Sequence, residues 1–543
     1  MKYADILKML VPQSEPLDAR QVENNAGGFV YAVDDWGRLD RFLILGSDAP
    51  TYYQAARALT RENAGVVERC YGADAARTVA RTVEISEQGR APKNDPAIFV
   101  LAIGAAHADE RVRKLALAAL PQVCRTATHL FQFVKAARAL GRGWGRSMKT
   151  AVGNWYRDKP VGDVAYQAVK YREREGYSHK RLLQTAHPAA VDGPDRIALF
   201  RWMRGIDGAA LSPDLPPLVT AHLRAMSDGV SRAELLALIS DHRLPWEAIP
   251  TAATSDPEVW RAMLPHLGLS ALVRNLGNMT KVGAIAPLSD AEALVADRLR
   301  DGVAIRKSRL HPFALLQAMS VYGAGRSVRG AGTWAPSRPV LDALDEAFYK
   351  AFANVIPTGK RHLLALDVSG SMGTSFIGGS LSARDASAAM ALVTMAVEPK
   401  THVVGFTSAG HASRQFGGMW GAGTAELSRL PISPRQRLAD AVKAVANLPF
   451  GGTDCALPML YALRERIEVD TFVIYTDSET WAGAVHPVKA LRDYRAKSGI
   501  PAKLIVVGMT SNGFSIADPT DAGMLDVVGF DAAAPSVMAD FAR

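Results

Sequence analysis

A change of hydrophobic periodicity near residue 360 is the feature that most constrains how this chain folds. Before that point, apolar residues recur every three or four positions, the spacing of one helical face. One such series is Val112, Leu115, Ala116, Ala119 and Leu120. After residue 360, short continuous apolar runs alternate with helical stretches. A chain of 543 residues also exceeds what one hydrophobic core supports. We therefore predict two domains, residues 1–359 and 360–543.

The first region is predicted to be an all-helical array. Amphipathic segments alternate with polar breaks, and Asp95-Pro96 and Asp109 mark helix starts. Glycines between 141 and 145 interrupt the pattern. Paired antiparallel helices of this kind stack into solenoids of the HEAT type, although no fixed period is present. Residues 27–46 differ, because alternating apolar residues predict a small hairpin that caps the helices.

The second region is predicted to be an α/β domain. Four continuous apolar runs lie at 363–366, 403–406, 472–475 and 504–507. Helical stretches at 384–398, 435–447 and 486–497 separate them. Continuous apolar strands that alternate with helices are typical of a doubly wound parallel sheet.

Oxygen-bearing side chains gather where two of these strands end. Asp367 ends the first strand, and Ser369 and Ser371 follow it in an Asp-x-Ser-x-Ser motif. Thr453 lies in the turn 451–454, and Asp477 follows the third strand. Ligands bind at the carboxyl ends of strands in open α/β sheets. Hard oxygen donors suit Mg²⁺, or alternatively Mn²⁺, so we predict a divalent-metal site. The alternative is that the first two residues only cap the following helix.

The basic charge is concentrated in the first region. Of 63 Lys+Arg and 54 Asp+Glu, the residues from 361 onward hold 16 and 17, which leaves 47 and 37 before them. Residues 135–181 hold 12 basic and 4 acidic side chains. Such a patch suits a polyanion, although a solvated helical surface has the same composition.

Basic residues within this patch are spaced as if on helical faces. Lys170 and Arg174 are four positions apart, which would place them on one face of a helix, and Arg172 lies between them. An upstream stripe at steps of three and four holds Lys135, Arg138, Arg142, Arg146 and Lys149. Such side chains can follow RNA phosphates.

Aromatic side chains interleave with the basic residues and would stack on unpaired bases or pack in the core. These residues are Trp144, Trp155, Tyr156, Tyr171 and Tyr177.

The run from Lys170 to Lys180, with Leu182-Leu183 and Ala186-His187 after it, resembles the signature of the Ro ribonucleoprotein autoantigen family. Those proteins join a TROVE domain to a von Willebrand factor A domain. Further similar segments lie at 41–46, 272–277, 311–313, 348–350 and 501–514. One departure is Tyr177, where many members have Trp. The five predicted metal ligands also resemble the metal-ion-dependent adhesion site of von Willebrand A domains, with no departure.

The resemblance implies a ring of HEAT-like repeats closed by the A domain. It implies small noncoding Y RNA on the outer surface and single-stranded 3′ ends of misfolded RNAs in the central hole. The family's Y-RNA contacts fall on Lys170, Arg174 and His187. The composition suggests a bacterial member, for which the resemblance implies an exoribonuclease partner and roles in RNA quality control and stress. An acidic side chain of a protein ligand would occupy the open metal position.

Two other functions are considered. Asp367 beside a metal could accept a phosphoryl group, but the sequence contains no Gly-x-Ser-x-Gly, His-Glu-x-x-His or P-loop motif, so we predict no enzyme. A metal-dependent, protein-binding adhesion module on a helical scaffold would leave the basic excess unexplained. Three cysteines provide no disulfide framework, and no secretory or spanning segment is found, so we expect a cytoplasmic protein with no membrane contact.

Overall fold

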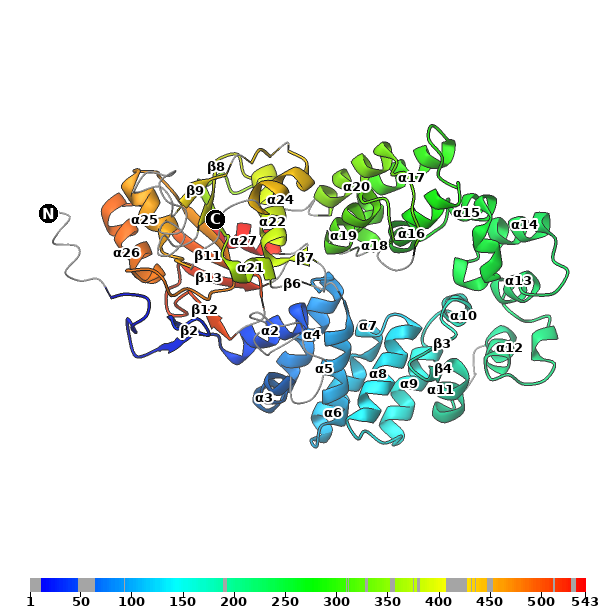
Figure 1. Ribbon diagram of the computed structural model, residues 1–543. Helices are drawn as coiled ribbons and strands as arrows, with labels where there is room; N and C mark the ends of the chain where they lie inside the picture. Colours follow the sequence, from blue (N-terminus) through cyan, green and yellow to red (C-terminus); the bar gives the residue numbers. More distant parts are fainter. Residues whose placement is uncertain are drawn as a thin grey trace.

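The computed structural model combines a curved array of helices with an α/β domain that lies between the two ends of the array (Figure 1). It describes residues 11–46, 64–91, 93–188, 193–308, 310, 312–327, 331–351, 357–374, 376–377, 381–406, 427–430, 432–434, 436–446, 453–510, 513–528 and 534–543. His311 of one resembling segment and the glycines at 451 and 452 lie outside these residues.

The array consists of short helices that pack on their sequence neighbours. They are α2 Asp35–Leu45, α3 Gly65–Ala73, α4 Ala75–Gln88, α5 Asp95–Ala106, α6 Glu110–Ala118, α7 Leu120–Val123, α8 Ala127–Ala139, α9 Arg146–Arg157, α10 Val161–Lys170, α11 His179–Ala186, α12 Pro194–Met203, α13 Pro217–Ala225, α14 Arg232–His242, α15 Pro257–Met263, α16 Leu269–Lys281, α17 Asp290–Arg300, α18 Gly302–Ser308, α19 Pro312–Gly323 and α20 Arg338–Lys350. Short 3₁₀ turns lie at Ala209–Leu211, Trp246–Ala248 and Thr251–Ser255.

Local side chains set the ends of these helices. Asp109 caps α6 by accepting a hydrogen bond from the Arg111 backbone N–H at 2.8 Å, as predicted. Asp95 is the first residue of α5, so the predicted start is correct, but the cap position belongs to Asn94. Gly46 ends α2 with a φ of 85°, a conformation that glycine adopts without steric cost.

The α/β domain contains a six-stranded sheet in the order β13-β11-β10-β5-β8-β9, parallel except for β9. Its strands are β5 His362–Asp367, β8 Thr401–Phe406, β9 Leu427–Arg429, β10 Thr471–Thr476, β11 Lys503–Gly508 and β13 Met524–Val528. The four predicted strands are present. Two others were not predicted, because β9 is short and polar and Asp526 interrupts the apolar run of β13.

Helices cover both faces of this sheet, so its strands are buried on both sides. One face packs against α22 Ala383–Val397, α24 Leu438–Ala446 and α27 Ala534–Ala542. The other packs against α25 Leu457–Arg464 and α26 Pro487–Ser498. Smaller elements are α21 Gly370–Thr374 and the hairpin of β6 Phe376–Ile377 and β7 Leu381–Ser382. The predicted fold class, a helical ring with a doubly wound α/β domain, is confirmed.

Both ends of the helical array contact the α/β domain, which closes the ring. At the first end, the buried Arg41 of α2 forms an ion pair with Asp526 of β13 at 2.9 Å. At the last end, Phe348 of α20 is fully buried within the core that covers one face of the sheet. Arg437 and Asp342 add an ion pair across the same junction.

The segment 27–46 is only partly the hairpin that was predicted. Phe29–Ala32 is a strand, β2, but it pairs with the preceding strand β1, Gln21–Glu23. It also pairs with β12, Phe514–Ser515, from the α/β domain. The second predicted arm, residues 41–45, is part of helix α2. Asp34 caps that helix by accepting a hydrogen bond from the Gly37 N–H. This cap signals the start of a helix, but the continuous apolar run at 41–45 favoured a strand in the prediction.

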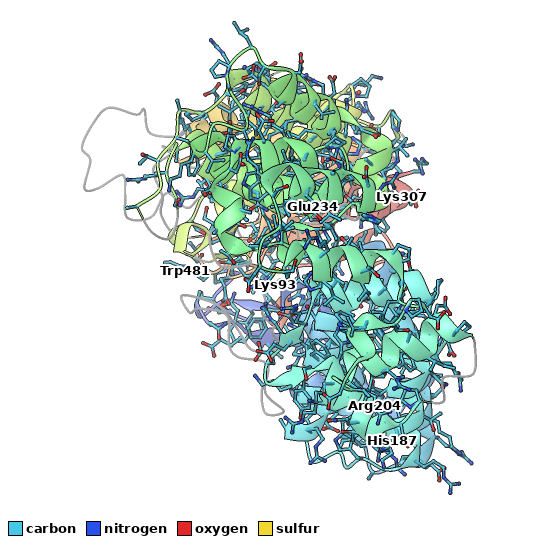
Figure 2. The ribbon with its side chains drawn as sticks, turned by 90° about the vertical axis from the view of Figure 1, so that its right-hand side faces the viewer. Lys93, His187, Arg204, Glu234, Lys307 and Trp481 are labelled. Atoms are coloured by element: carbon cyan, nitrogen blue, oxygen red, sulfur yellow. The ribbon has the colours of Figure 1, made fainter. Side chains whose placement is uncertain are left out.

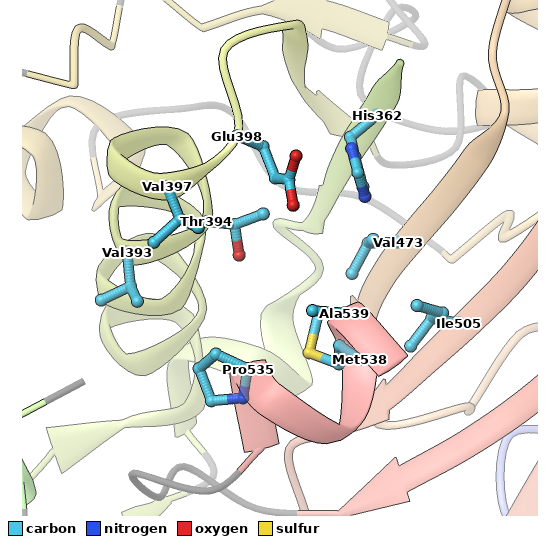
Figure 3. Close-up of a pocket in the computed structure, with 10 residues that line it drawn as sticks. All are labelled: His362, Val393, Thr394, Val397, Glu398, Val473, Ile505, Pro535, Met538 and Ala539. Carbon is cyan, nitrogen blue, oxygen red and sulfur yellow. The ribbon is translucent and has the colours of Figure 1, made fainter. Parts of the chain in front are cut away.

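A small cavity lies between α22, α27 and the sheet, near the start of β5 (Figure 3). Its volume of about 20 Å³ is room for about one water molecule. The buried Glu398 lies beside it and accepts hydrogen bonds from the backbone N–H groups of Thr358 at 2.7 Å and Gly359 at 3.2 Å. These bonds fix the chain as it enters β5, so the cavity is a packing feature of the domain boundary.

Candidate functional sites

The predicted metal ligands come from the carboxyl end of the sheet, at the point where its strand order reverses. The chain passes from β5 to β8 on one side, then returns to β10, β11 and β13 on the other. Ligands of open α/β sheets bind in the crevice at such a switch point. Asp367 is the last residue of β5, and Asp477 directly follows the neighbouring β10.

The Asp-x-Ser-x-Ser loop is tightly folded and buried. Asp367 accepts hydrogen bonds from the Ser369 N–H at 2.9 Å and from the Thr476 hydroxyl at 2.7 Å. The hydroxyl oxygens of Ser369 and Ser371 lie 3.1 Å apart. Arg384, which sequence reasoning missed, donates to the carbonyl oxygens of Val368 and Ser369 at 3.1 and 2.9 Å. No sequence motif predicts this contact of Arg384, because it depends on how α22 packs behind the loop.

The other two predicted ligands occupy adjoining loops. Thr453 and Asp477 are 3% and 2% exposed. The carbonyl oxygen of Thr453 accepts from the backbone N–H groups of Trp481 and Ala482, each at 3.1 Å, which joins the two loops. The structure therefore brings the neighbourhood of all five predicted ligands to one edge of the sheet.

The electrostatics of this cluster favour a cation. Burial, together with the charge of Asp477, raises the pKa of Asp367 to about 7. Burial also raises the pKa of Asp477. Two desolvated carboxylates side by side are costly unless a positive charge compensates them. Among the described residues no group of three or more His, Cys, Asp or Glu side chains is placed to hold a metal, so binding here would depend on the hydroxyl oxygens as well. An all-oxygen set fits a hard divalent cation.

One inference about the basic surface is wrong. Helix α10 ends at Lys170, so Lys170 and Arg174 do not share a helical face. Arg174 belongs to a two-stranded hairpin of β3 Glu173–Arg174 and β4 Tyr177–Ser178. The hairpin turns at Glu175 and Gly176, whose φ angles are 57° and 78°. A two-residue loop with both φ angles positive matches a right-handed strand twist, and this turn ends the helical pattern.

The hairpin nevertheless keeps its basic residues beside those of α8, against which β3 packs. Exposed Lys135 of α8 forms an ion pair with Glu175 at 2.5 Å. Arg174 is 59% exposed at its side chain, and Arg172 bonds to a ring nitrogen of His222 at 2.8 Å. Lys170 is half-buried, with its ammonium 5.3 Å from the ring centres of Tyr166 and Tyr171.

The remaining upstream residues continue this surface toward α9. Exposed Arg138 donates to the Arg142 carbonyl oxygen at 2.8 Å, and Arg142 donates to the Ser147 hydroxyl at 2.6 Å. Arg146 and Lys149 follow on α9. The predicted stripe therefore runs over two helices and the glycine-rich turn between them.

A pocket of about 440 Å³ opens between α9 and the end of α11. Its wall includes Trp144, Arg146, Lys149, Asn154, Arg157 and His187. His187 is exposed and ends α11 in the left-handed conformation, with a φ of 49°. Figure 2 places it near the lower end of the helical array, well away from Trp481. Sequence reasoning missed Asn154 and Arg157, although their spacing from Lys149 and Arg146 on one helix was the available signal.

The five aromatic residues divide into two groups. Trp155 and Tyr156 are 1% and 0% exposed, so the core alternative holds for both. Trp144, Tyr171 and Tyr177 are half-buried at the surface. The Arg181 guanidinium lies 4.6 Å from the ring centre of Tyr177, which already stacks a cation on this ring.

Comparisons with known proteins cover both regions of the chain. The model of the TROVE domain matches residues 22–201 and 241–330, and that of the Ro60 vWA domain matches residues 361–542. The chain is 46% identical over 538 residues to an RNA-binding protein RO60 from Deinococcus radiodurans, covering 98% of this chain and 97% of that one. It is 36% identical over 618 residues to an RNA-binding protein RO60 from Caenorhabditis elegans, covering 98% and 92%. The crystal structure of the Deinococcus radiodurans RO (RSR) protein matches with a TM-score of 0.70 and 43% identity over 94% of this chain and 99% of that chain.

Proposed function

Because the chain belongs to the Ro60 family, in which a TROVE domain is joined to a vWA domain, we propose that it binds structured noncoding RNA through its basic helical surface. Y RNAs are the proposed ligands of the outer surface, and single-stranded 3′ ends of misfolded RNAs are those of the ring hole. The proposed roles are RNA quality control and the stress response, in the cytoplasm, with an exoribonuclease as partner.

The observation that carries this proposal is the continuity of exposed cations over α8, the β3–β4 hairpin and α9. Lys135 and Arg174 approach one another there through Glu175. Cations in this arrangement attract phosphates and displace condensed counterions, which gives salt-dependent affinity. The pocket near His187 combines Trp144 with Arg146 and supplies both a ring face and positive charge. Unpaired bases are recognised by such combinations.

Replacing Lys170 and Arg174 together with Gln tests the surface. We expect about tenfold weaker binding of a Y-like stem and a smaller slope of log affinity against log salt, by about 0.9 for each lost phosphate contact. The matched control is Arg224→Gln, which removes an exposed arginine paired with Glu234 on α13 and α14. Unchanged affinity and slope in the double variant would remove this surface from the proposal. Sequencing of the RNA that co-purifies with the protein would identify the ligand.

We also propose that Asp367, Ser369, Ser371, Thr453 and Asp477 hold Mg²⁺, or alternatively Mn²⁺. When bound, the cation would supply a Lewis-acidic position that accepts an acidic oxygen of a protein ligand. The chain's own residues provide the buried oxygen cage, and Arg384 holds the carbonyl groups of the loop. Calorimetric titration of the purified full chain with MgCl₂ tests the site.

A second candidate function is a metal-dependent adhesion module that binds a protein. It is favoured by Trp481, which is 42% exposed in the loop that follows Asp477. Exposed aromatic residues are frequent anchors of protein interfaces. Capture of a protein that is lost in Asp477→Ala, with RNA binding retained, would support this second function alongside the first.

None of the described helices is both long and apolar enough to cross a membrane.

A further inference from the structure

The N-terminal strap, defined here as residues 11–32, lies across the two loops that lead from the predicted metal ligands Thr453 and Asp477. This strap precedes α2, the first helix of the array, yet its contacts are with the α/β domain. The first loop is residues 453–456 and the second is residues 477–485. We call them the Thr453 loop and the Asp477 loop.

Gln13 bridges the two loops with one side chain. It is 0% exposed, and its amide nitrogen donates to the Asp454 carboxylate of the Thr453 loop at 2.7 Å. The same nitrogen donates to the Val485 carbonyl oxygen at the end of the Asp477 loop, also at 2.7 Å. The amide oxygen of Gln13 accepts a hydrogen bond from the Thr480 hydroxyl. A buried amide whose donors and acceptor are all engaged fixes its partners in position.

Asn24 and Gly28 hold the Asp477 loop at a second point. The Asn24 amide nitrogen donates to the carbonyl oxygens of Thr480 at 2.9 Å and Ser478 at 3.3 Å. Its oxygen accepts from the Gly28 N–H at 2.8 Å, which shapes the turn of the strap. A β-carbon at Gly28 would lie 1.8 Å from the Thr480 carbonyl oxygen, so only glycine permits this approach.

The two loops also bond directly to each other, and the strap adds further hydrogen bonds between them. The Cys455 N–H donates to the Thr480 hydroxyl at 3.1 Å, and that hydroxyl in turn bonds to Gln13. Gly483 has no room for a side chain, because a β-carbon there would lie 2.3 Å from the Gln13 amide nitrogen. The two loops are therefore joined both directly and through a segment more than 400 residues away along the chain.

We propose that three residues of the N-terminal strap, Gln13, Asn24 and Gly28, are positioning residues of the metal centre that set the separation of the Thr453 and Asp477 loops. This inference rests on the metal site of the proposed function. Ligand geometry must be held within about 0.5 Å for tight binding, and supporting residues therefore influence affinity. By linkage, a strap that strengthens cation binding is itself held more firmly when the cation is bound. Cation binding would thus reinforce one of the junctions that close the ring.

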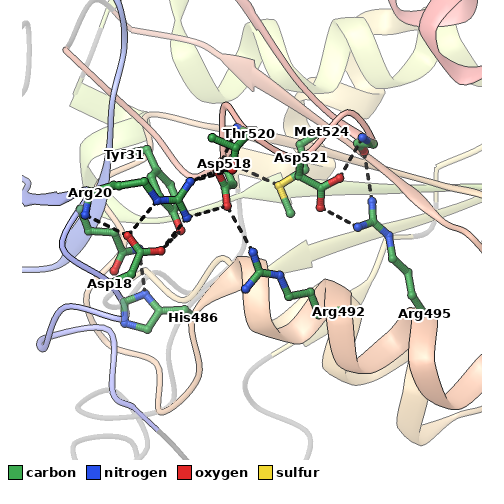
Figure 4. A network of polar contacts seen from close by, with 12 residues as sticks. Asp18, Arg20, Tyr31, His486, Arg492, Arg495, Asp518, Thr520, Asp521 and Met524 are labelled. Atoms are coloured by element: carbon green, nitrogen blue, oxygen red, sulfur yellow. Dashed lines mark hydrogen bonds and ion pairs between the residues drawn. The ribbon is translucent and has the colours of Figure 1, made fainter.

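The middle of the strap, between Gln13 and Asn24, provides a matched control (Figure 4). Arg20 forms ion pairs with Asp18 at 2.7 Å and with Asp518 at 2.8 Å. Arg492 reaches the same Asp518 carboxylate at 3.3 Å. None of these residues belongs to the Thr453 or Asp477 loop. Arg20→Gln therefore loosens the strap without changing a contact to either loop.

The first experiment measures binding of Mn²⁺ and Mg²⁺ to the full-length chain by calorimetry and by the electron paramagnetic resonance of free Mn²⁺. Gln13→Ala is expected to weaken affinity by about 10- to 100-fold, the range typical of residues that support metal ligands. Arg20→Gln should stay within about twofold of wild type, since ligand geometry is then retained. Asp477→Ala defines complete loss. Equal affinities in wild type and Gln13→Ala would overturn the inference while leaving the metal site intact. Failure of wild type to bind either cation would overturn the metal site itself, and the inference with it.

The second experiment uses the wild-type chain, so it does not depend on the folding of a strap variant. Hydrogen exchange of the strap is compared without cation and with saturating MgCl₂. The amides of Gln13 and Phe29, which bond to the Gly483 carbonyl oxygen and to the Gln13 carbonyl oxygen, are the most informative. We expect slower exchange with Mg²⁺ in wild type and no change in Asp477→Ala. If the wild-type protein binds Mg²⁺ but the exchange rates of the strap do not change, the coupling between the strap and the cation site is contradicted.

Discussion

The basic surface of the array and the proposed metal centre of the α/β domain are built for ligand recognition in opposite ways. Side chains of Lys135 and Arg174 are 56% and 59% exposed, and no rigid cage surrounds them. Asp367 and Asp477 are 0% and 2% exposed and are bonded on several sides. A surface of exposed cations acts by summed charge and tolerates imprecise geometry. A buried oxygen cage requires each ligand in place. Single substitutions should therefore affect the two regions very differently.

The sharpest contrast is expected from Asp367→Ala. Loss of a direct carboxylate ligand should reduce Mg²⁺ and Mn²⁺ affinity by more than about 100-fold, beyond the loss typical of a supporting residue. RNA affinity should remain within about twofold, since no phosphate contact is removed. Calorimetry with cation and filter binding with RNA measure both on one preparation.

A large fall in RNA affinity in Asp367→Ala, with unchanged thermal unfolding, would break the separation of the two regions. It would mean that the cation organises the ring surface.

A smaller effect is expected when three cations of the pocket near His187 are replaced. Arg146, Lys149 and Arg157 changed together to Gln should weaken RNA binding about 30-fold at low salt and by much less at high salt, as counterion release predicts. Cation binding at the α/β domain should not change. Filter binding across a salt series measures the slope, and the paired surface variant Arg224→Gln is the control. A loss that is equal at all salt concentrations would contradict electrostatic capture.

The same contrast explains what the sequence revealed. The Asp-x-Ser-x-Ser loop was predicted because its donors lie within five residues, after a strand that the apolar pattern identifies. The basic patch at residues 135–181 could be predicted from composition alone. The helical placement of Arg174 was wrong, because the turn at Glu175 and Gly176 overrides the i, i+4 spacing. The strap was not foreseen at all, since Gln13 and Asp454 are 441 positions apart and no local pattern links them.

One acid-dependent loss of stability is expected in the array. His179 is buried in α11, and this burial lowers its pKa to about 4 from an ordinary value of 6.5. The unfolded chain therefore binds this proton first as pH falls, so stability is complete above pH 6.5 and decreases between pH 6.5 and pH 4. By pH 5 the loss should be about 1–2 kcal/mol.

The His179→Gln variant keeps a polar partner for the Tyr156 hydroxyl, which lies 3.0 Å from the histidine ring nitrogen. Its thermal midpoint should change less between pH 7.5 and pH 5 than that of wild type. Hydrogen exchange should locate the difference in α8, α9 and α11. If the thermal midpoint of the variant changed with pH as much as that of wild type, the loss of stability in acid would be assigned to other titratable groups.

The smallest effect is expected from Glu175→Asn, which tests whether summed charge alone governs the basic surface. Glu175 places a carboxylate 2.5 Å from the Lys135 ammonium and 4.0 Å from the Arg174 guanidinium, so it competes with phosphate for both. Asn tolerates the positive φ of 57° at this position, and the hairpin should therefore persist. RNA affinity should rise about two- to threefold at low salt and converge with wild type at high salt, because exposed charges are screened. A decrease measured by filter binding would show that Glu175 orients Lys135 for the RNA, and that this surface depends on geometry as the proposed metal centre is expected to.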